Sequence, residues 1–327
     1  MIKILISRRI GIDSFTPLNP LYLPVVCGSH FLSTEERIKT KWSMDDKGDN
    51  ISEKRNSYCE FTVQYWAFKN LSLEFFGLCH YRRFLVFSRG NFKRNSLNLI
   101  NGGVLNKKTS LRYGLSDPVL MESVIRKFDL IVNEDSDVTH IPTPKGFQTT
   151  VWNHWSAFAG VFFKERALSL LMAELKEKHP DKLDVALEYL RGSKHRGYNC
   201  YIAKKNVFED LNKFQFSILF SLESKIKKEG LDEEFPRTMG YMGEILYGIF
   251  VYSKIKENAI KVKELPLVYF EVTDIPSRSR FLRLCLIILA ISKVKFEKLG
   301  YHLFPIETRR RQIVKNIYYF LIKQFRK

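Results

Sequence analysis

The sequence lacks the features that mark membrane-spanning, disulfide-bonded and zinc-binding proteins. Its longest apolar run, 284–291, falls far short of the roughly 20 residues that a transmembrane helix needs. The five cysteines are odd in number and form no C-x-x-C pair, so neither a disulfide framework nor a zinc site is predicted. Glycine and proline, at 17 and 11 of 327 residues, are too few for a low-complexity chain. With 45% hydrophobic residues the chain can bury a sizeable core, which excludes a disordered protein.

The first residues also lack the pattern of a secretory signal peptide. The apolar run within 1–9 is short, and no small-residue cleavage site follows it. We therefore expect a buried β-strand there. Together with the sparse cysteines, this predicts a protein of the reducing cytoplasm.

Acidic residues are scarce relative to basic ones. Asp and Glu total 35 against 53 Lys and Arg, which gives a formal net charge of +18. Such an excess points to a polyanionic partner, which is nucleic acid, an anionic membrane surface or a polyphosphate substrate. More than half of the net charge lies in 276–327, where only Glu297 and Glu307 are acidic.

The basic C-terminal segment carries apolar residues at helical spacing, which are Ile313, Val314, Ile317, Phe320, Leu321 and Phe325. A basic helix with one apolar face is typical of segments that lie on a membrane surface. We therefore expect a folded domain over 1–275 and a membrane-associating tail over 276–327. Nucleic acid is the weaker alternative, because the basic residues gather in this tail and no nucleic-acid-binding motif is present.

Short apolar strands alternate with helical segments along the first 272 residues. Strands are expected at 2–7, 74–79, 128–132, 198–203 and 268–272, and helices at 56–70, 117–127, 167–178, 182–191, 207–226 and 241–251. A polar surface loop is expected at 91–116, with Asn101-Gly102-Gly103 as a turn signal. This alternation predicts an α/β fold, a mostly parallel sheet flanked by helices. Ligands bind such sheets beyond the carboxyl ends of the strands, so the site candidates are 7–9, 80–83 and 133–137.

Several distinctive motifs follow one another over the first 252 residues. They are G-D-N-I-S-E-K at 48–54, Y-C-E at 58–60, Y-W-A-F-K-N at 65–70, G-L-C-H-Y-R-R-F at 77–84, H-R-G-Y-N-C-Y-I at 195–202 and R-T-M-G-Y-M-G-E at 237–244. This series resembles the signature of a family of bacterial glycosyltransferases, long catalogued as a domain of unknown function and found in gene clusters for capsule, exopolysaccharide and lipopolysaccharide O-antigen. One departure is Ser7-Arg8-Arg9, where the family commonly has Thr-His-Lys.

The resemblance implies a GT-A-like nucleotide-binding domain and a hexosyltransferase that uses a nucleotide-sugar donor. The implied donor is UDP-linked, with UDP-galactose and UDP-galactofuranose as candidates. The implied acceptor is a lipid-linked glycan, and the enzyme would lie in the cytoplasm, peripheral on the inner face of the cell membrane. A non-catalytic scaffold that binds a nucleotide or a glycan remains the alternative, because fold analogy does not exclude it.

A nucleotide-sugar transferase has to stabilise a departing diphosphate, either with a divalent metal or with protein cations. We expect Arg82 or Arg83 to contact the diphosphate, because a guanidinium matches phosphate geometry; a structural salt bridge is the alternative for either one. Asp49 and Asn50 could hydrogen-bond the base or the ribose of the nucleotide, and an Asx turn explains these two residues equally well. The full set of donor-binding candidates is Ser7, Arg8, Asp49, Asn50, Tyr81, Arg82, Arg83, Asn199 and Arg237.

A metal site is the other way to hold the diphosphate. Asp135 and Asp137 form an Asp-x-Asp pair after an expected strand, and such oxygen ligands suit Mg²⁺ or Mn²⁺. The motif is short and arises often by chance. A solvated acidic loop, with a metal-independent reaction, is the alternative.

An inverting transfer needs a carboxylate that takes the proton of the acceptor hydroxyl. Glu244 is the first candidate for this base, and Asp184 is a weaker one. His80 is a second catalytic candidate, as a group that orients a substrate hydroxyl or binds phosphate, with a structural role as the alternative. Glu60 is assigned instead to a capping box with Ser57 at the start of a helix.

Aromatic side chains at 152–155 suggest the acceptor site. Trp152, His154 and Trp155 could line a glycan cleft, because aromatic faces stack on sugars, and the two tryptophans could equally belong to the core.

Overall fold

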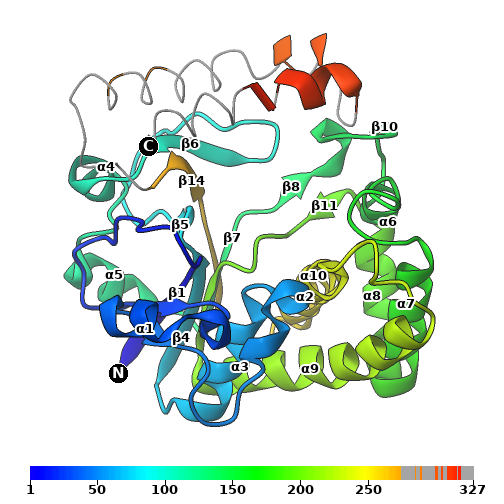
Figure 1. Cartoon of the computed structure of the whole chain (residues 1–327), viewed down its shortest axis with the longest axis horizontal. Coiled ribbons are helices and arrows are strands. Elements are labelled where there is room, and N and C mark those ends of the chain that lie inside the picture. The colour runs from blue at the N-terminus through cyan, green and yellow to red at the C-terminus, as the bar shows by residue number, and fades with distance from the viewer. Residues whose placement is uncertain are drawn as a thin grey trace.

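A computed structural model describes residues 1–273, 284, 288, 299–300, 303–304, 308–314 and 316–317. Its centre is a mixed sheet in the order β13-β7-β12-β4-β1-β2-β3 (Figure 1). The strands are β1 (Ile2–Arg8), β2 (Tyr22–Val26), β3 (Ser43–Met44), β4 (Phe75–His80), β7 (Leu130–Asn133), β12 (Tyr201–Lys204) and β13 (Val262–Leu265). Only β12 runs antiparallel to its neighbours along this path. The expected α/β fold with a mostly parallel sheet is confirmed.

The register of the sheet brings the ends of several strands to one edge. Ser7 of β1 pairs with His80 of β4, so the residues that follow these two strands lie side by side. Because β12 runs in the opposite direction, the residues that precede it, Tyr198 and Asn199, reach the same edge. We call this edge, where the parallel strands end, the carboxyl edge.

Alternate residues of the central strands bury their side chains on opposite faces of the sheet, as the two-residue period of a strand requires. Leu5 and Leu78 join one hydrophobic cluster, which also contains residues of the long helices. Ile6 and Cys79 join a second cluster on the other face. The sheet is therefore buried on both sides, which explains why its strands are apolar throughout.

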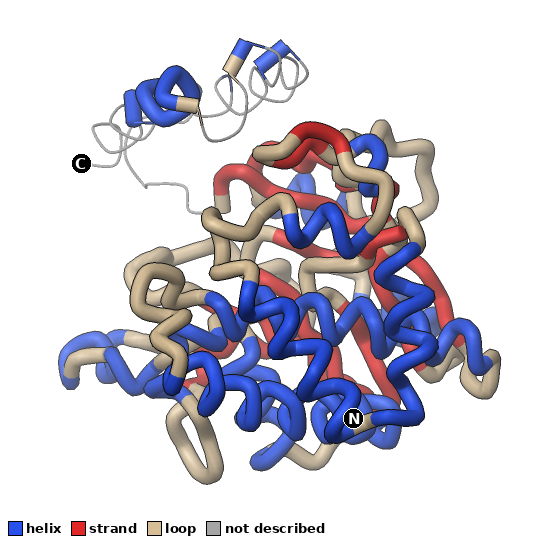
Figure 2. Tube along the Cα trace, turned by 90° about the vertical axis from the view of Figure 1, so that its right-hand side faces the viewer, coloured by secondary structure: helices blue, strands red, loops and turns tan. Residues whose placement is uncertain are grey.

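Helices cover both faces of the sheet, and Figure 2 shows the strands behind a layer of helices. The helices expected at 117–127, 167–178, 182–191, 207–226 and 241–251 are confirmed within a few residues. In the described part, no helix combines the length and apolar character needed to cross a membrane. The helices are α1 (Thr34–Lys39), α2 (Arg55–Tyr58), α3 (Phe61–Asn70), α4 (Lys107–Arg112), α5 (Pro118–Ile125), α6 (Val151–Ser156), α7 (Arg166–Lys178), α8 (Leu183–Arg191), α9 (Lys205–Lys228) and α10 (Thr238–Glu257).

The expectation of a surface loop at 91–116 is wrong, because this segment contains α4 and the strand β6 (Leu99–Val104). β6 pairs in parallel with β14 (Leu267–Val272), which also pairs antiparallel with β5 (Arg83–Leu85). Gly102, expected to mark a turn, lies inside β6, where a Cβ atom would come within 2.6 Å of the Phe270 ring. Two short ribbons complete the strands, β8 (Ser136–Asp137) with β11 (Lys194–His195) and β9 (Pro142–Thr143) with β10 (Gly146–Phe147).

The helix expected over 56–70 is broken. α2 ends at Tyr58, Cys59 has a φ of 53°, and α3 begins at Phe61. Glu60 makes no capping hydrogen bond, so the capping box with Ser57 is also wrong. A residue at positive φ cannot continue a right-handed helix, and the break turns the Glu60 side chain toward the carboxyl edge.

Most of the expected tail at 276–327 lies outside the described residues, and its division from the rest at 275 stays a prediction. Among the tail residues that are described, large apolar side chains are about half exposed, and Arg309 and Arg310 are exposed. These apolar residues are Leu284, Ile288, Leu299, Leu303, Ile313, Val314 and Ile317.

Candidate active site

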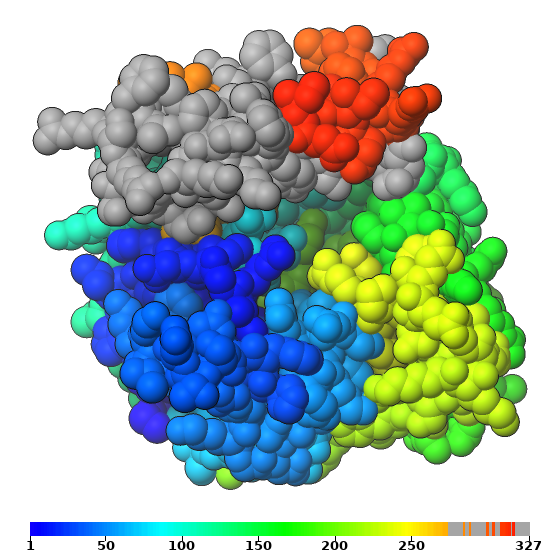
Figure 3. Space-filling model, viewed as in Figure 1, coloured from blue at the N-terminus to red at the C-terminus, as the bar shows by residue number. Residues whose placement is uncertain are grey.

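Four motifs that are far apart in the sequence meet at the carboxyl edge. They contribute the end of β4, the turn before α3, the turn before β12 and the first turns of α10. Figure 3 shows the N-terminal segment in blue adjoining the segment that holds α10 in yellow. Hydrogen bonds link the turns directly: Asn199 Nδ2 donates to Glu60 Oε1 at 2.9 Å, and the Tyr198 N–H donates to Glu244 Oε1 at 2.6 Å.

His80, at the end of β4, is surrounded by positive charge. Burial lowers the pKa of its imidazole well below the ordinary value, and the guanidiniums of Arg83, Arg82, Arg237 and Arg9 lower it further. The imidazole is therefore neutral near pH 7. The Arg82 N–H donates to Nδ1 at 3.3 Å, which leaves the ring proton on Nε2. We call His80 and these four arginines the arginine cluster.

Arg82 and Arg83 form no ion pair with any described residue. Their guanidiniums lie over aromatic rings instead, Arg82 at 5.3 Å from the Tyr81 ring centroid and Arg83 at 4.7 Å from that of Tyr198. The Nε atom of each is buried without a hydrogen-bond partner. For Arg83, the structural salt bridge considered as the alternative finds no support in the described part. The charge of Glu271 acts on Arg82, so the alternative stays open for that residue.

Glu60 is a residue of this edge that sequence reasoning missed. Its carboxylate accepts the hydrogen bond from Asn199, and the Asn199 Oδ1 atom is buried without a partner. The turn that presents Glu60 is held from two sides, since the Cys27 thiol donates to the Cys59 carbonyl at 3.1 Å and the Arg237 Nε donates to Cys59 Sγ at 3.2 Å. The S-x-x-E spacing matched a capping box, and nothing in the sequence signals a positive φ at Cys59.

Glu244 lies on the first turns of α10, beside the turn at Tyr198. Burial raises the pKa of its carboxyl, and the charge of Glu60 adds to the rise, while the Tyr198 N–H and two arginines oppose it. Gly197 makes the close approach of backbone and carboxylate feasible, because a Cβ atom there would lie 2.4 Å from Glu244 Oε1. Glu244 thus combines a hydrogen-bonded position with a raised pKa, which suits a general base.

Asp45 is a second residue that the sequence did not single out. It is fully buried, and its carboxylate accepts hydrogen bonds from the Gly28 N–H and from the N–H and hydroxyl of Ser29. It also accepts from the hydroxyls of Ser52 at 2.5 Å and Thr62 at 2.6 Å. Asp45 therefore fixes the loop after β2 against the first turn of α3, next to Glu60.

Three donor-binding candidates of the first strands have buried side chains. Arg8 is 1% exposed, and its guanidinium donates to the Ser14 carbonyl at 2.6 Å and to the Phe15 carbonyl and Thr16 hydroxyl. Burial lowers the pKa of Arg8 to about 10. Ser7 and Tyr81 are 4% exposed. In this structure the Arg8 guanidinium is therefore occupied by the loop at 14–16.

Asp49 and Asn50 lie away from the arginine cluster. The Asn70 amide donates to the Asp49 carbonyl at 2.7 Å, and Lys69 lies 3.5 Å from the Asp49 carboxylate, so both contacts are at the C-terminal end of α3. That end leads directly into the start of β4, at the opposite edge of the sheet. Asn50 accepts from the Ser52 N–H at 3.1 Å, which is the Asx turn considered as the alternative.

The Asp135–Asp137 pair does not fit a metal site in this structure. The Asp137 carboxylate accepts hydrogen bonds from the Thr139 N–H and hydroxyl and forms an ion pair with Lys194 at 3.2 Å. These contacts, the Thr139 hydroxyl first, lower the pKa of the Asp137 carboxyl to about 2. Asp135 lies 3.7 Å from the guanidinium of Arg196. No group of three or more His, Cys, Asp or Glu side chains that could hold a metal ion occurs among the described residues.

The acceptor candidates lie mostly in the core. His154 and Trp155 are 6% and 5% exposed, and both pack against the His195 ring. Trp152 is partly buried and packs against the hydrophobic cluster that contains Trp155. The core alternative therefore fits Trp155, and His154 is buried beside it. Asp184, the weaker candidate base, is exposed in the first turn of α8.

The fold and this edge define an α/β protein with a cluster of cationic side chains beyond the carboxyl ends of its parallel strands, beside two carboxylates. The chain belongs to the family described as a domain of unknown function (DUF4422), whose model matches residues 4–256. A family of this kind was expected from the motifs at 48–84 and 195–244.

A solved structure shares the fold. It is the apo structure of WbbM, a bifunctional glycosyltransferase, with a TM-score of 0.74 and 23% sequence identity. The match covers 85% of this chain and 47% of that one, so this chain spans about half of the length of WbbM. No curated protein is similar enough to match.

Proposed function

We propose that the chain is a glycosyltransferase that takes a sugar from a nucleotide-sugar donor. The observation that carries this proposal is the arginine cluster, whose guanidiniums lie beside the carboxylates of Glu60 and Glu244. A diphosphate leaving group needs preorganised cations, and the acceptor hydroxyl needs a base. The fold shared with a bifunctional glycosyltransferase supports the same reaction class.

The proposed step is a direct displacement. The acceptor oxygen bonds to the anomeric carbon while the bond from that carbon to the diphosphate oxygen breaks, and the diphosphate leaves with the electron pair. Glu244 takes the hydroxyl proton. Arg82 and Arg83 neutralise the leaving charge, and His80 donates from Nε2 to a phosphate oxygen. No step is routed through a metal ion, because Asp135 and Asp137 do not fit one.

The finer assignments follow from the motif resemblance. We propose a UDP-sugar as donor, with UDP-galactose and UDP-galactofuranose as the first candidates, and a lipid-linked glycan as acceptor. The product would belong to capsule, exopolysaccharide or O-antigen synthesis. A non-catalytic scaffold would bind the same donor at the same cations and transfer nothing.

A donor screen tests the proposal. We expect a UDP-sugar, with or without a chelator, to raise the melting temperature, because a ligand at 100 times its Kd stabilises the folded state by about 2.7 kcal/mol. The same sugar should then be transferred to lipid-linked acceptors in membranes. Stabilisation by the donor without sugar transfer would identify a scaffold. A rise in melting temperature that occurs only with manganese would contradict the metal-independent step.

We also propose that the tail at 276–327 binds an anionic membrane surface and brings the enzyme to its lipid-linked acceptor. Support comes from the exposed arginines at 309–310 and the half-exposed apolar residues nearby. Each basic residue near an anionic surface contributes about 1 kcal/mol.

Vesicle sedimentation tests the tail. Replacing Arg309, Arg310 and Arg311 together with glutamine is expected to weaken binding to phosphatidylserine vesicles roughly a hundredfold, since about 3 kcal/mol is lost. The matched control replaces the exposed Lys176, Lys205 and Lys228 and removes the same charge elsewhere. Equal sedimentation of the two variants would rule out a role for this segment.

A further inference from the structure

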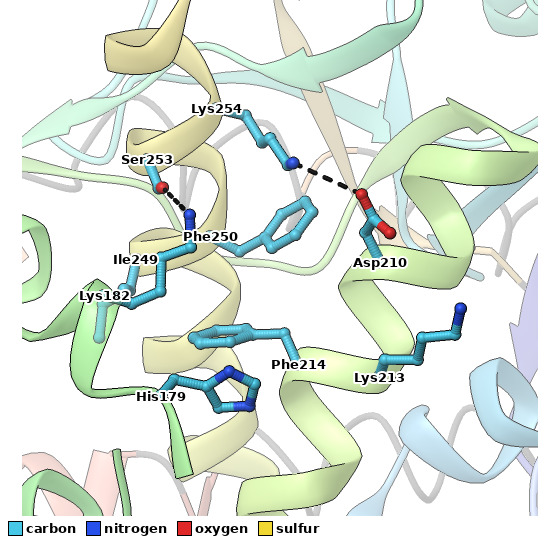
Figure 4. Close-up of a pocket in the computed structure, with 9 residues that line it drawn as sticks. All are labelled: His179, Lys182, Asp210, Lys213, Phe214, Ile249, Phe250, Ser253 and Lys254. Carbon is cyan, nitrogen blue, oxygen red and sulfur yellow. Dashed lines mark hydrogen bonds and ion pairs between the residues drawn. The ribbon is translucent and has the colours of Figure 1, made fainter. Parts of the chain in front are cut away.

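A cavity of about 200 Å³ lies between α9, α10 and the segment that joins α7 to α8 (Figure 4). It is far from the arginine cluster for a topological reason. α9 begins directly after β12, which is antiparallel to β4, and α10 ends just before β13, which is parallel to β7. These helix ends therefore lie at the edge of the sheet opposite the carboxyl edge.

The base of the cavity is apolar and aromatic. Phe214 and Phe250 are each 6% exposed, and their ring centroids are 6.0 Å apart. The His179 ring packs against Phe214 at 5.0 Å and hydrogen-bonds the Ser217 hydroxyl at 2.8 Å. Figure 4 shows the Phe214 ring in the middle of the cavity, between residues of α10 and the His179 side chain. This base offers flat apolar contact and few polar groups.

The rim of the cavity is cationic. Lys182, Lys213 and Lys254 line it together with a single carboxylate, that of Asp210. Lys254 lies 3.5 Å from Asp210, and its ammonium is 5.4 Å from the centroid of the Phe250 ring.

The lysines retain a net positive charge after their pairings are counted. Glu257, outside the lining, pairs with Lys182 at 2.6 Å and with Lys254 at 3.8 Å. Lys213 has no ion-pair partner in the described part of the chain. The three ammonium groups face two carboxylates, those of Asp210 and Glu257, which leaves an excess of one positive charge. Lys213, which is exposed, is the lysine without an ion-pair partner among the described residues.

We propose that this cavity binds a small organic phosphate whose organic part is apolar or aromatic. The ring of such a ligand would lie on Phe214 and Phe250, and its phosphate would meet the ammonium groups of Lys213 and Lys254. Lysine is a suitable partner for this, since it binds phosphate as a mobile point charge. The volume lies below the range of about 300–1,000 Å³ usual for drug-sized ligands, so the ligand is a small one. Because the cavity lies at the opposite edge of the sheet, the ligand takes no direct part in the proposed transfer.

Calorimetric titration of the full chain with phenyl phosphate tests this site. We expect saturable binding, and at least about tenfold weaker binding of inorganic phosphate, which lacks the ring, and of phenol, which lacks the charge. Lys213→Gln and Lys254→Gln are each expected to weaken phenyl phosphate binding at least about tenfold, which is the effect of losing one hydrogen bond to a charged group. Lys176→Gln, an exposed lysine of α7 outside the cavity, is the matched control and should bind as the unaltered chain does.

Three results would overturn the proposal. The first is no binding of phenyl phosphate up to about 10 mM, an affinity too weak for a specific site. The second is binding that both cavity variants leave unchanged but Arg83→Gln weakens, because it would place the ligand at the arginine cluster. The third is equally tight binding of inorganic phosphate and phenyl phosphate, because the rings of Phe214 and Phe250 would then have no role in binding. Lys213 is exposed, so its variant is expected to fold. The test measures binding alone, and its outcome does not depend on the proposed transfer reaction.

Discussion

Replacing Arg83 with glutamine is expected to lower kcat/KM for sugar transfer at least about a hundredfold, because removing one preorganised donor at a developing negative charge costs roughly 10²–10³ in rate. Arg83→Lys keeps the charge but loses the planar fork, and should recover only part of the rate. The fold should tolerate both changes. No ion pair with a described residue is broken, and the lost contact with the Tyr198 ring accounts for about 0.5–1 kcal/mol.

Arg126 supplies the matched control for Arg83. It is a surface arginine whose guanidinium pairs with Glu74 at 3.0 Å and Glu122 at 2.7 Å, and Glu74 immediately precedes β4 at the opposite edge of the sheet. Exposed pairs of this kind contribute about 0–1 kcal/mol, so Arg126→Gln should leave transfer unchanged. Steady-state kinetics and UDP binding should both separate the two variants. An Arg83→Gln enzyme with the original kcat/KM and UDP affinity would remove the arginine cluster from the mechanism.

The sequence predicts those parts of the molecule that depend on local periodicity. Short runs buried on both faces indicated β1, β4 and β7, and amphipathic spacing indicated α7 to α10, because both patterns reflect which side chains face the core. The rule that ligands bind beyond the carboxyl ends of parallel strands correctly placed Arg82 and Arg83 at that edge. The motif at 237–244 likewise indicates Glu244 as a candidate from the sequence alone.

The parts that could not be predicted depend on partners far away in the sequence. The positive φ of Cys59, which turns Glu60 to the site, is held by contacts with Cys27 and Arg237. Asp45 acts through the segments at 28–29, 52 and 62, none of which carries a recognisable signal on its own. Gly102 suggested a turn, but its missing Cβ accommodates the Phe270 ring of β14. In each case the local pattern was compatible with a simpler structure, and tertiary packing decided otherwise.

Replacing Glu244 with glutamine is expected to lower kcat roughly 10²- to 10⁴-fold, because an amide cannot take the proton of the acceptor hydroxyl. Burial and the charge of Glu60 raise the pKa of the Glu244 carboxyl. Transfer by the unaltered enzyme should therefore increase with pH through a pKa above that of an ordinary glutamate, and the variant should lack this increase. A pH profile of kcat/KM in both proteins measures the effect.

The same pKa shift has a consequence for stability. A carboxyl whose pKa is higher in the folded than in the unfolded state contributes stability at low pH, and this contribution is lost as pH rises through the folded pKa. Glutamine carries no charge and can still accept the Tyr198 N–H. The Glu244→Gln protein should thus be more stable to urea than the original above that pH, while it is the less active of the two.

Glu60→Gln is the experiment that decides between the two carboxylates of the edge. The amide oxygen of the variant can still accept the hydrogen bond from Asn199, so we expect a loss of at most about tenfold in kcat, the effect of weakening one hydrogen bond to a charged group. The increase of transfer with pH, which is the acidic limb of the pH profile, should remain because Glu244 still takes the proton. If Glu60→Gln instead abolishes that limb and Glu244→Gln keeps it, then Glu60 is the base. Glu244 would in that case act only by holding the turn at Tyr198 through its 2.6 Å hydrogen bond.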